Sequence, residues 1–406
     1  MSHGEDAYRA HVRAWLEANT EPLAEVDGYP TRYWMHGPDL DAAHYEACRS
    51  MRTALYDAGF VGITLPRELG GQGGEAWMDR IFAEEAADRN VDTGFLHAIA
   101  SMALPALLHY GTQEQQVEHV PGMLSARTRW CQLFSEPGAG SVLAGLACRA
   151  ERDGDEFVIN GQKVWNSAAV YADKGLLLAR TDPSVAKHAG ITFLLLDMNQ
   201  PGVEARRLVQ ANGAGHFSEV FLTDARCSVT DVLGEVDDGW RVARMVMASE
   251  SATIGAAPID YVARLRNLAR ATGQDIDPTV RQDLAAVWTR QRLQRLTGAR
   301  LAHAHRTGTP TDIHPSALKI GASEQRIAEG DLATRLLGAT ATAIDHEASA
   351  WAMDLLHMRF GMTIGGGTDQ VHRNNIAEQA LGLPREPNPD KGLPWNKTRR
   401  SGIGPA

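Results

Sequence analysis

The sequence contains few cysteines, and none of them stands in a pattern that builds a disulfide framework or binds a metal. The four cysteines, Cys48, Cys131, Cys148 and Cys227, include no C-x-x-C pair and no histidine spacing that we interpret as a metal site. A free cysteine commonly packs as a small buried hydrophobic side chain. We therefore expect reduced, buried thiols in a cytoplasmic protein and no bound metal.

Long apolar runs and an excess of basic charge are also missing. No run reaches about 18 apolar residues and the polar N-terminus shows no signal peptide, so we expect no membrane segment and a cytoplasmic location. With 40 Lys and Arg against 50 Asp and Glu, the formal net charge is −10, which argues against a nucleic-acid-binding surface. The one basic cluster, at 397–400, lies in a tail rich in proline and glycine that we expect to be disordered.

No G-x-G-x-x-G follows an apolar strand, so binding of NAD is not favoured. What the chain does have is the length and composition of a globular protein. Its 406 residues are 44% hydrophobic and 22% charged, which leaves room for two or three domains with ample core.

Hydrophobic periodicity divides the chain into three parts. Apolar residues recur at helical spacing in the first third, for example at Tyr8, Val12, Trp15 and Leu16. From about residue 128, short apolar runs separated by Gly, Asn, Asp and Pro predict an antiparallel β domain, and helical periodicity returns after Gly239. This order predicts an α+β fold with a helical domain at 1–127, a β domain at 128–234, a helical bundle at 235–387 and an extended tail at 388–406.

Two segments of the middle part are suited to binding a flat polar ligand. Residues 132–141 read Gln-Leu-Phe-Ser-Glu-Pro-Gly-Ala-Gly-Ser, a loop whose small residues let backbone N–H groups approach such a ligand. Residues 157–165 predict a hairpin with an Asn160-Gly161 turn. Its second strand would present the aromatic plane of Trp165, with the hydroxyl of Ser167 on the same strand face.

Both segments resemble motifs of the acyl-CoA dehydrogenase family, roughly S/T-E-P-x-A-G-S-D and N-G-x-K-x-W-x-T/S. Residues 65–71, 110–115 and 363–384 match further motifs in the family's order, so the resemblance covers about residues 6–387. It implies the family's fold, with a central antiparallel β-barrel-like domain between an N-terminal helical domain and a C-terminal helical bundle. It also implies FAD as the cofactor, with each site completed by a neighbouring subunit.

The resemblance also assigns residues to the flavin. It implies that residues 132–141 wrap the pyrimidine side with the Ser135 hydroxyl, that Trp165 covers the dimethylbenzene end, and that Ser167 bonds near N5. The turn at 367–370 would reach the adenosine half. The implied FAD-binding set is Gln132, Leu133, Phe134, Ser135, Gly140, Ser141, Trp165, Asn166, Ser167, Thr368, Asp369 and Gln370, with Ser141 and Gly367 also placed at the substrate.

The catalytic base is predicted on a helix of the C-terminal part. Many members of the family carry a glutamate just before the C-terminal Gly-Thr, but Gly366 stands there. Other members carry the base about eleven residues past a glycine that matches Gly239, which leads to Glu250. The residues Val242, Val246, Glu250 and Ile254 follow one another at i+4, so this carboxylate projects from an apolar stripe. Gly366 is left a backbone role, since its N–H could stabilise the enolate.

Two departures from the family pattern bear on activity. Val142 replaces an aspartate after Gly-Ser, and Ser251 replaces an arginine after the base. The main hypothesis is an acyl-CoA dehydrogenase of fatty acid or lipid metabolism that passes electrons to an electron-transfer flavoprotein, assembled as a homodimer or homotetramer. Two alternatives stay open: a non-catalytic or half-site subunit of a hetero-oligomer, and a dehydrogenase of a carrier-protein-bound acyl group.

Overall fold

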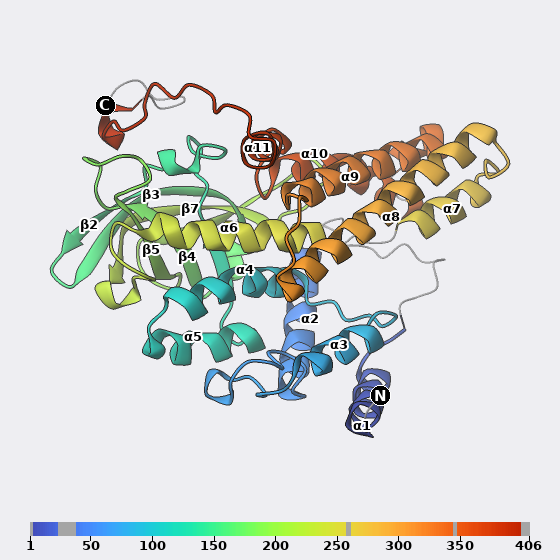
Figure 1. Cartoon of the computed structure of the whole chain (residues 1–406), viewed down its shortest axis with the longest axis horizontal. Coiled ribbons are helices and arrows are strands. Elements are labelled where there is room, and N and C mark those ends of the chain that lie inside the picture. Colours follow the sequence, from blue (N-terminus) through green and yellow to red (C-terminus); the bar gives the residue numbers. More distant parts are fainter. Residues whose placement is uncertain (1–2, 23–37, 257–260, 344–346, 399–406) are drawn as a thin grey trace.

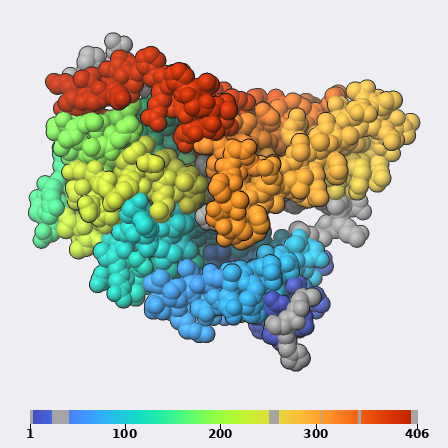
Figure 2. All heavy atoms as spheres, viewed as in Figure 1, coloured from blue at the N-terminus to red at the C-terminus, as the bar shows by residue number. Residues whose placement is uncertain are grey.

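The computed structural model describes residues 3–22, 38–256, 261–343 and 347–398. A curved β domain lies between a layer of N-terminal helices and an elongated C-terminal helical bundle (Figure 1). The α–β–α order read from the sequence and the α+β class are therefore confirmed. In the space-filling view the molecule is hollowed between the N-terminal helices and the bundle (Figure 2).

The N-terminal helices follow the predicted apolar stripes. Val12 and Leu16 are buried on α1, and Ile81 is buried on α3. Helix α5 begins with a capping box, in which Thr112 and Gln115 satisfy each other's backbone N–H groups. The helices are α1 His3–Asn19, α2 Pro38–Asp57, α3 Ala76–Glu85, α4 Gly94–Tyr110 and α5 Gln113–Ser125.

The β domain is a seven-stranded sheet in which β1, β4, β2, β3, β7 and β6 lie side by side, with β5 pairing β4. Most neighbouring strands are antiparallel, as expected, at the pairs β2–β3, β3–β7, β4–β5 and β6–β7. The exception is β4, which runs parallel to both β1 and β2. The strands are β1 Trp130–Leu133, β2 Arg149–Asp153, β3 Glu156–Ser167, β4 Lys174–Arg180, β5 Ile191–Asp197, β6 Val203–Leu208 and β7 Phe217–Ser228.

The predicted hairpin at Asn160-Gly161 does not form. The two residues lie inside the continuous strand β3, at a register shift in its pairing with β7. Asn160 exchanges hydrogen bonds with Asp224, and a Cβ on Gly161 would lie 2.7 Å from the Cα of Cys148. The turn is made instead at Gly154, between Asp153 and Glu156, where β2 and β3 pair. Cross-strand contacts thus decide which of two turn-forming pairs bends the chain.

In the C-terminal bundle, α8 shows clear capping residues at both of its ends. The Asp277 side chain accepts from the backbone N–H of Thr279, Pro278 occupies the first turn of α8, and Gly308 ends that helix in the left-handed conformation. A separate core around Trp351 and Leu265 holds the bundle together. Its helices are α6 Gly239–Ala256, α7 Val262–Ala271, α8 Pro278–Thr307, α9 Ser316–Leu337, α10 Glu347–Ile364 and α11 Asp369–Asn375.

The tail after α11 packs on the β domain through residues 394–398, where the sequence led us to expect disorder; residues 399 and 400 of the basic cluster lie outside the described residues. It runs back from α11 over the β domain (Figure 1). Trp395 is 7% exposed, its backbone N–H donates to Val185 O at 2.7 Å, and its indole N–H donates to Gly145 O at 3.3 Å. The Arg180 guanidinium stacks over the indole at 4.9 Å. A single buried tryptophan therefore fastens the tail beside the loop that follows β1.

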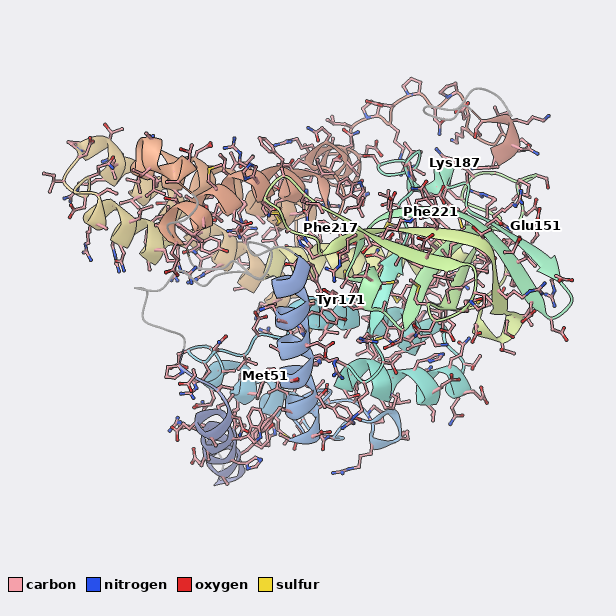
Figure 3. All side chains as sticks on the ribbon, turned by 180° about the vertical axis from the view of Figure 1, so that it is seen from behind. Met51, Glu151, Tyr171, Lys187, Phe217 and Phe221 are labelled. Carbon is pink, nitrogen blue, oxygen red and sulfur yellow. The ribbon has the colours of Figure 1, made fainter. Side chains whose placement is uncertain are left out.

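Helix α2 ties the N-terminal helices to the β domain. Tyr45 of α2 stacks on Tyr171 with ring centroids 4.4 Å apart and an interplanar angle of 15°. Figure 3 shows Tyr171 beside this helix when the molecule is seen from behind. Asp41, also on α2, accepts a hydrogen bond from Gly215 N at 2.8 Å. These contacts fix the position of the β domain against α2.

No helix among the described residues is long and apolar enough to cross a membrane.

Candidate active site

Glu250 lies on α6, on the face that carries the buried side chains of Val242 and Val246. Burial raises the pKa of its carboxyl group, and a hydrogen bond from the Gln132 side chain partly opposes that rise. The Gln132 Nε2 atom lies 3.4 Å from Glu250 Oε2. The structure thus brings the proposed base and a residue of the loop 132–141 together, although 118 positions separate them. The side chain of Ile254 lies outside the described residues.

The loop 132–141 continues from β1 and is held in place by one of its own residues, Glu136, to which the sequence analysis gave no role. The Glu136 carboxylate accepts from Ala147 N at 2.6 Å and from Cys148 N at 2.9 Å. It also forms an ion pair at 2.8 Å with Lys163, whose side chain is fully buried. Lys163 donates in addition to Phe134 O at 3.0 Å. Residues 134 and 136 of the loop are therefore tied to β3 through the Lys163 side chain, and Glu136 also ties the loop to the backbone of residues 147 and 148.

The end of β3 also touches the loop. Asn166 Nδ2 donates to Gln132 O at 2.8 Å, and Val164 N donates to Ser135 O at 2.9 Å. Hence the two segments that the sequence analysis proposed for the flavin lie side by side. Leu133 and Phe134 point into the core, at 0% and 4% exposure, so that only their backbone can face a ligand.

Trp165 has an uncommon backbone conformation. Its φ is 62°, and it is the extra residue of a bulge where the register of β3 on β7 shifts between Val164 and Asn166. The bulge breaks the alternation of side chains, so spacing alone no longer places Trp165 and Ser167 on one face. The indole is 59% exposed and meets Phe217 edge to face at 5.9 Å. A bulky residue held in this conformation with its ring uncovered is the kind of feature found at ligand sites.

The residues present fit a flavin. Asn166 and Ser218 are register partners on β3 and β7, and each buries a side-chain oxygen without a hydrogen-bond partner among the described residues. A flavin edge carries both N–H and carbonyl groups that could satisfy them. A Cβ on Gly140 would meet nothing within 4 Å, and Ser141 and Val142 are exposed, so the loop leaves open the approach that a flat ring requires.

The turn between α10 and α11 forms a second cluster. Gly366 and Gly367 have φ of 66° and 90°, where glycine is favoured. His372, which the sequence analysis did not single out, donates from Nε2 to Gly366 O at 2.8 Å, and its Nδ1 lies 2.8 Å from Ser316 Oγ. Because a carbonyl only accepts, His372 must carry a proton on Nε2. The histidine therefore holds the Gly366 carbonyl, and with it the peptide group between Gly366 and Gly367.

The proposed adenosine-contacting residues lie at the start of α11. The Thr368 hydroxyl caps the helix by accepting from Val371 N at 3.2 Å. The Asp369 carboxylate is buried in an ion pair with Lys319 at 2.8 Å and accepts from Ser323 at 2.9 Å. Gln370 is exposed. The Thr368 side chain thus caps α11 itself and the Asp369 side chain holds α11 on α9, which leaves Gln370 and backbone atoms to meet a ligand.

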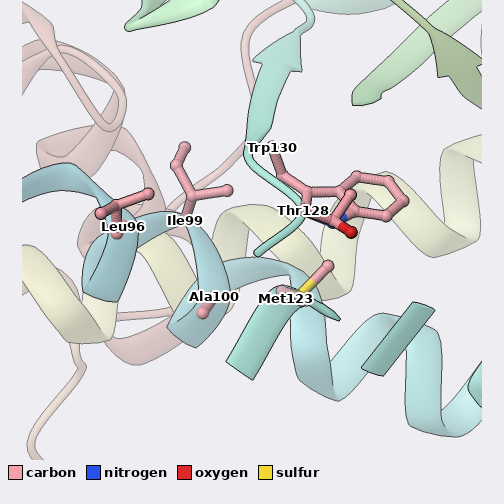
Figure 4. Close-up of a pocket in the computed structure, with 6 residues that line it drawn as sticks. All are labelled: Leu96, Ile99, Ala100, Met123, Thr128 and Trp130. Atoms are coloured by element: carbon pink, nitrogen blue, oxygen red, sulfur yellow. The ribbon is translucent and has the colours of Figure 1, made fainter. Parts of the chain in front are cut away.

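A small cavity lies where α4 and α5 meet β1 (Figure 4). Its volume is about 10 Å³, which is the space of one water molecule. An acyl group needs far more room, so this is a packing void in the core and not a substrate pocket. It is lined by Leu96, Ile99, Ala100, Met123, Thr128 and Trp130.

All three parts of the chain match domains of one protein family. The acyl-CoA dehydrogenase N-terminal, middle and C-terminal domains match residues 2–127, 131–225 and 237–381. The fold and the site geometry define a flavin-dependent oxidoreductase that acts on CH–CH bonds. The chain belongs to the acyl-CoA dehydrogenase family, whose members use FAD.

Individual relatives are similar over almost the full length. The acyl-CoA dehydrogenase IpdE1 of Mycobacterium tuberculosis is 36% identical over 388 residues, which cover 94% of this chain and 98% of the relative. The IpdE1 of Mycolicibacterium smegmatis is 35% identical over 395 residues, with 93% and 98% covered.

Two solved structures share the fold and name two subunits each. The Tcur3481-Tcur3483 steroid ACAD is 28% identical with a TM-score of 0.75, covering 95% of this chain and 99% of that one. The ChsE4-ChsE5 complex from Mycobacterium tuberculosis is 26% identical with a TM-score of 0.72, with the same coverage.

Proposed function

We propose that this chain removes two hydrogens from the α and β carbons of an acyl-CoA thioester and yields the trans-2-enoyl thioester. Glu250 takes the Cα proton on one carboxylate oxygen. Bound FAD supplies the oxidising power by accepting the hydride from Cβ, and the electrons then pass to an electron-transfer flavoprotein. The observation that carries this proposal is the contact between Glu250 and Gln132, because it puts a partly buried carboxylate against the loop assigned to the flavin.

The raised pKa of Glu250 suits a base for a weakly acidic Cα–H. A carboxylate moved out of water binds a proton more strongly, and Glu250 lies on an apolar face of α6. The remaining hydrogen bond from Gln132 keeps one oxygen oriented while the other stays available.

In this proposal the backbone N–H of Gly366 stabilises the negative charge that develops on the thioester oxygen. As Cα loses its proton, charge develops on the thioester oxygen, and a backbone N–H at Gly366 donates to it. His372 holds the next peptide group, between Gly366 and Gly367, through the Gly366 carbonyl, and so restrains the turn that carries the Gly366 N–H. Ser141 and Gly367 complete the substrate contacts.

A flavin would lie along the loop 132–141 and the end of β3. Gln132, Ser135, Gly140 and Ser141 would hold it with side-chain or backbone groups, and Leu133 and Phe134 with their backbone alone. Trp165, Asn166 and Ser167 would flank it. The start of α11, at 368–370, is anchored on α9 and would contact the adenosine half of a flavin in the assembled protein.

The names of the structural relatives support a substrate class. The steroid ACAD named Tcur3481-Tcur3483 and the ChsE4-ChsE5 complex favour a bulky, ring-bearing acyl group such as a steroid-derived one over a straight fatty acyl chain. Each of the two is named as a pair of proteins, which supports assembly with a homologous partner or a second copy. Exposed apolar side chains on the bundle offer the surface for it. They are Trp288, Leu293, Leu296, Phe360 and Ile364.

Glu250→Gln tests the proposal. We expect anaerobic bleaching of the flavin by substrate to slow by at least ~10²–10⁴-fold, because the amide cannot take a proton. FAD content should not change. Glu235→Gln, at an exposed position after the β domain, is the matched control and should bleach like wild type.

The outcomes separate the alternatives. Wild-type bleaching by Glu250→Gln would make Glu250 a structural residue. Colourless protein that takes up no FAD would favour a non-catalytic partner subunit. Bleaching by an acyl-carrier protein and not by acyl-CoA would favour the carrier-protein alternative. A panel of straight-chain and ring-bearing acyl-CoAs measures the substrate class.

A further inference from the structure

Three side chains with metal-binding atoms converge on one point between α2 and the segment before α4. His44 and Cys48 stand four residues apart on α2, and Asp92 lies in the segment before α4. Cys48 Sγ is 3.2 Å from His44 Nε2, and Asp92 Oδ2 is 3.3 Å from the same nitrogen. The three atoms all lie within 4.8 Å of one another.

The Cys48 and Asp92 atoms both approach one ring nitrogen of His44, which differs from a catalytic Cys–His–Asp triad. In a catalytic Cys–His–Asp arrangement the thiol and the carboxylate contact different ring nitrogens, and the ring passes a proton between them. Here the sulfur and the carboxylate oxygen both approach Nε2, which has one proton or one lone pair to offer. A cation at the centre of the three atoms would be ligated by all of them.

We propose that His44, Cys48 and Asp92 form a site for one borderline-soft divalent cation such as Zn²⁺. Tetrahedral Zn²⁺ with sulfur, nitrogen and oxygen ligands has ligand–ligand distances of roughly 3.4–3.6 Å. The observed 3.2 Å and 3.3 Å lie within a few tenths of that range. A thiolate with an imidazole selects Zn²⁺ over Mg²⁺ or Ca²⁺, which prefer oxygen ligands.

The surroundings meet the other needs of a metal site. Cys48 is buried beside Leu96, Ala126 and Ala168, whereas the side chains of His44 and Asp92 are 27% and 55% exposed. The cation therefore has a route from solvent, and water can fill the fourth position. Gly94 N donates to the second oxygen of Asp92 at 2.9 Å, which orients the carboxylate.

The sulfur must lose its proton to bind the cation. Burial and the nearby Asp92 carboxylate raise the pKa of the Cys48 thiol, so without a cation it stays protonated at neutral pH. Binding therefore releases a proton and strengthens as pH rises. The bound cation would join α2 to the segment that leads into α4 and stabilise the N-terminal helices by mass action.

The test uses the purified full-length holoenzyme without a polyhistidine tag, dialysed against a chelator and then titrated with Co²⁺. We expect one Co²⁺ per chain with a thiolate-to-metal charge-transfer band, displaced by Zn²⁺, and a Zn²⁺-dependent rise in Tm. Cys48→Ser and Asp92→Asn should each weaken binding by at least about tenfold, as expected when one of three ligands is changed. Cys227→Ser is the matched control, since Cys227 is also buried but lies in the β domain.

Absence of stoichiometric Co²⁺ binding by wild type would overturn the proposal. So would charge-transfer absorption that persists in Cys48→Ser and disappears in Cys227→Ser. In both cases the three residues form only a hydrogen-bonded ion-pair network. Because Asp92 is exposed, Asp92→Asn keeps the test decisive if Cys48→Ser fails to fold.

Discussion

Two buried lysine–carboxylate pairs support the two halves of the proposed site. Lys163 pairs with Glu136 beneath the flavin loop, and Lys319 pairs with Asp369 at the start of α11. In both pairs the lysine is 0% exposed, the carboxylate side chain is 8% exposed, and the nitrogen and oxygen lie 2.8 Å apart. The two pairs are nearly the same electrostatically.

The two pairs differ in what else they bind. Glu136 also accepts from two backbone N–H groups, and Lys163 also donates to a backbone carbonyl, so this pair shapes the main chain of residues 134–148. Asp369 is instead held by Lys319 and the hydroxyl of Ser323, both on α9, so this pair docks one helix on another. The same kind of ion pair therefore shapes a proposed ligand-binding loop in one region and packs one helix on another in the other region.

Lys163→Met should produce the largest effect. It leaves a buried carboxylate without its cation and Phe134 O without its donor, and we expect a loss of about 3–5 kcal/mol in the free energy of unfolding. Because the loop loses its anchor, bound FAD should be lost as well. Denaturant unfolding and the flavin-to-protein absorbance ratio measure the two effects. Lys391→Met, at an exposed position, is the control; a Lys163 variant as stable and as yellow as this control would refute the anchoring role.

Lys319→Met should destabilise the chain by about 3 kcal/mol, at the lower end of the range for a broken buried pair. Asp369 keeps Ser323 and lies in the first turn of α11, where the helix dipole favours negative charge. Hydrogen exchange should quicken in α9 and α11 but not in residues 134–148. Equal loosening of both regions would show that the two pairs do not act separately.

His372→Leu should have a smaller effect on stability, about 1–3 kcal/mol, because it leaves Gly366 O and the Ser316 hydroxyl without their partner. The expected signature is a lower kcat with FAD still bound, since the peptide at Gly366 is no longer held. His372→Gln keeps a donor and an acceptor, and we expect it to restore part of kcat. A change in flavin content with kcat unaltered would place His372 at the cofactor and not at the substrate.

Gln132→Leu should give the smallest effect, visible in the pH dependence of kcat. Glu250 must be ionised to take a proton, so activity rises with pH through its pKa. The Gln132 hydrogen bond lowers that pKa, and its removal should raise it and shift the acidic limb to higher pH. At 3.4 Å the bond is long, so we expect the shift to be small. Gln162→Leu, which loses a bond to Glu219, should leave the profile unchanged; a shift to lower pH in Gln132→Leu would contradict this assignment.

Local sequence determined the helices and the family. Asp277-Pro278 begins α8 and Gly308 ends it because caps depend on residues within one turn. The i+4 spacing of Val242, Val246 and Glu250 likewise placed the carboxylate on an apolar face, and the motifs at 132–141 and 160–167 pointed to a flavin enzyme. The roles of the individual site residues remain predictions.

Tertiary structure alone decided features that depend on residues far apart in sequence. Asn160 and Gly161 remain within the strand β3, because Asn160 bonds Asp224 and Gly161 packs closely against Cys148. Trp165 lies at a bulge that is set by the pairing of β3 with β7. The tail packs on the β domain because Trp395 stacks under Arg180 and donates a hydrogen bond to Gly145 O. Lys163 and Lys319 each lie in the sequence without a nearby acid, and only folding supplies the buried carboxylates that make these charges tolerable.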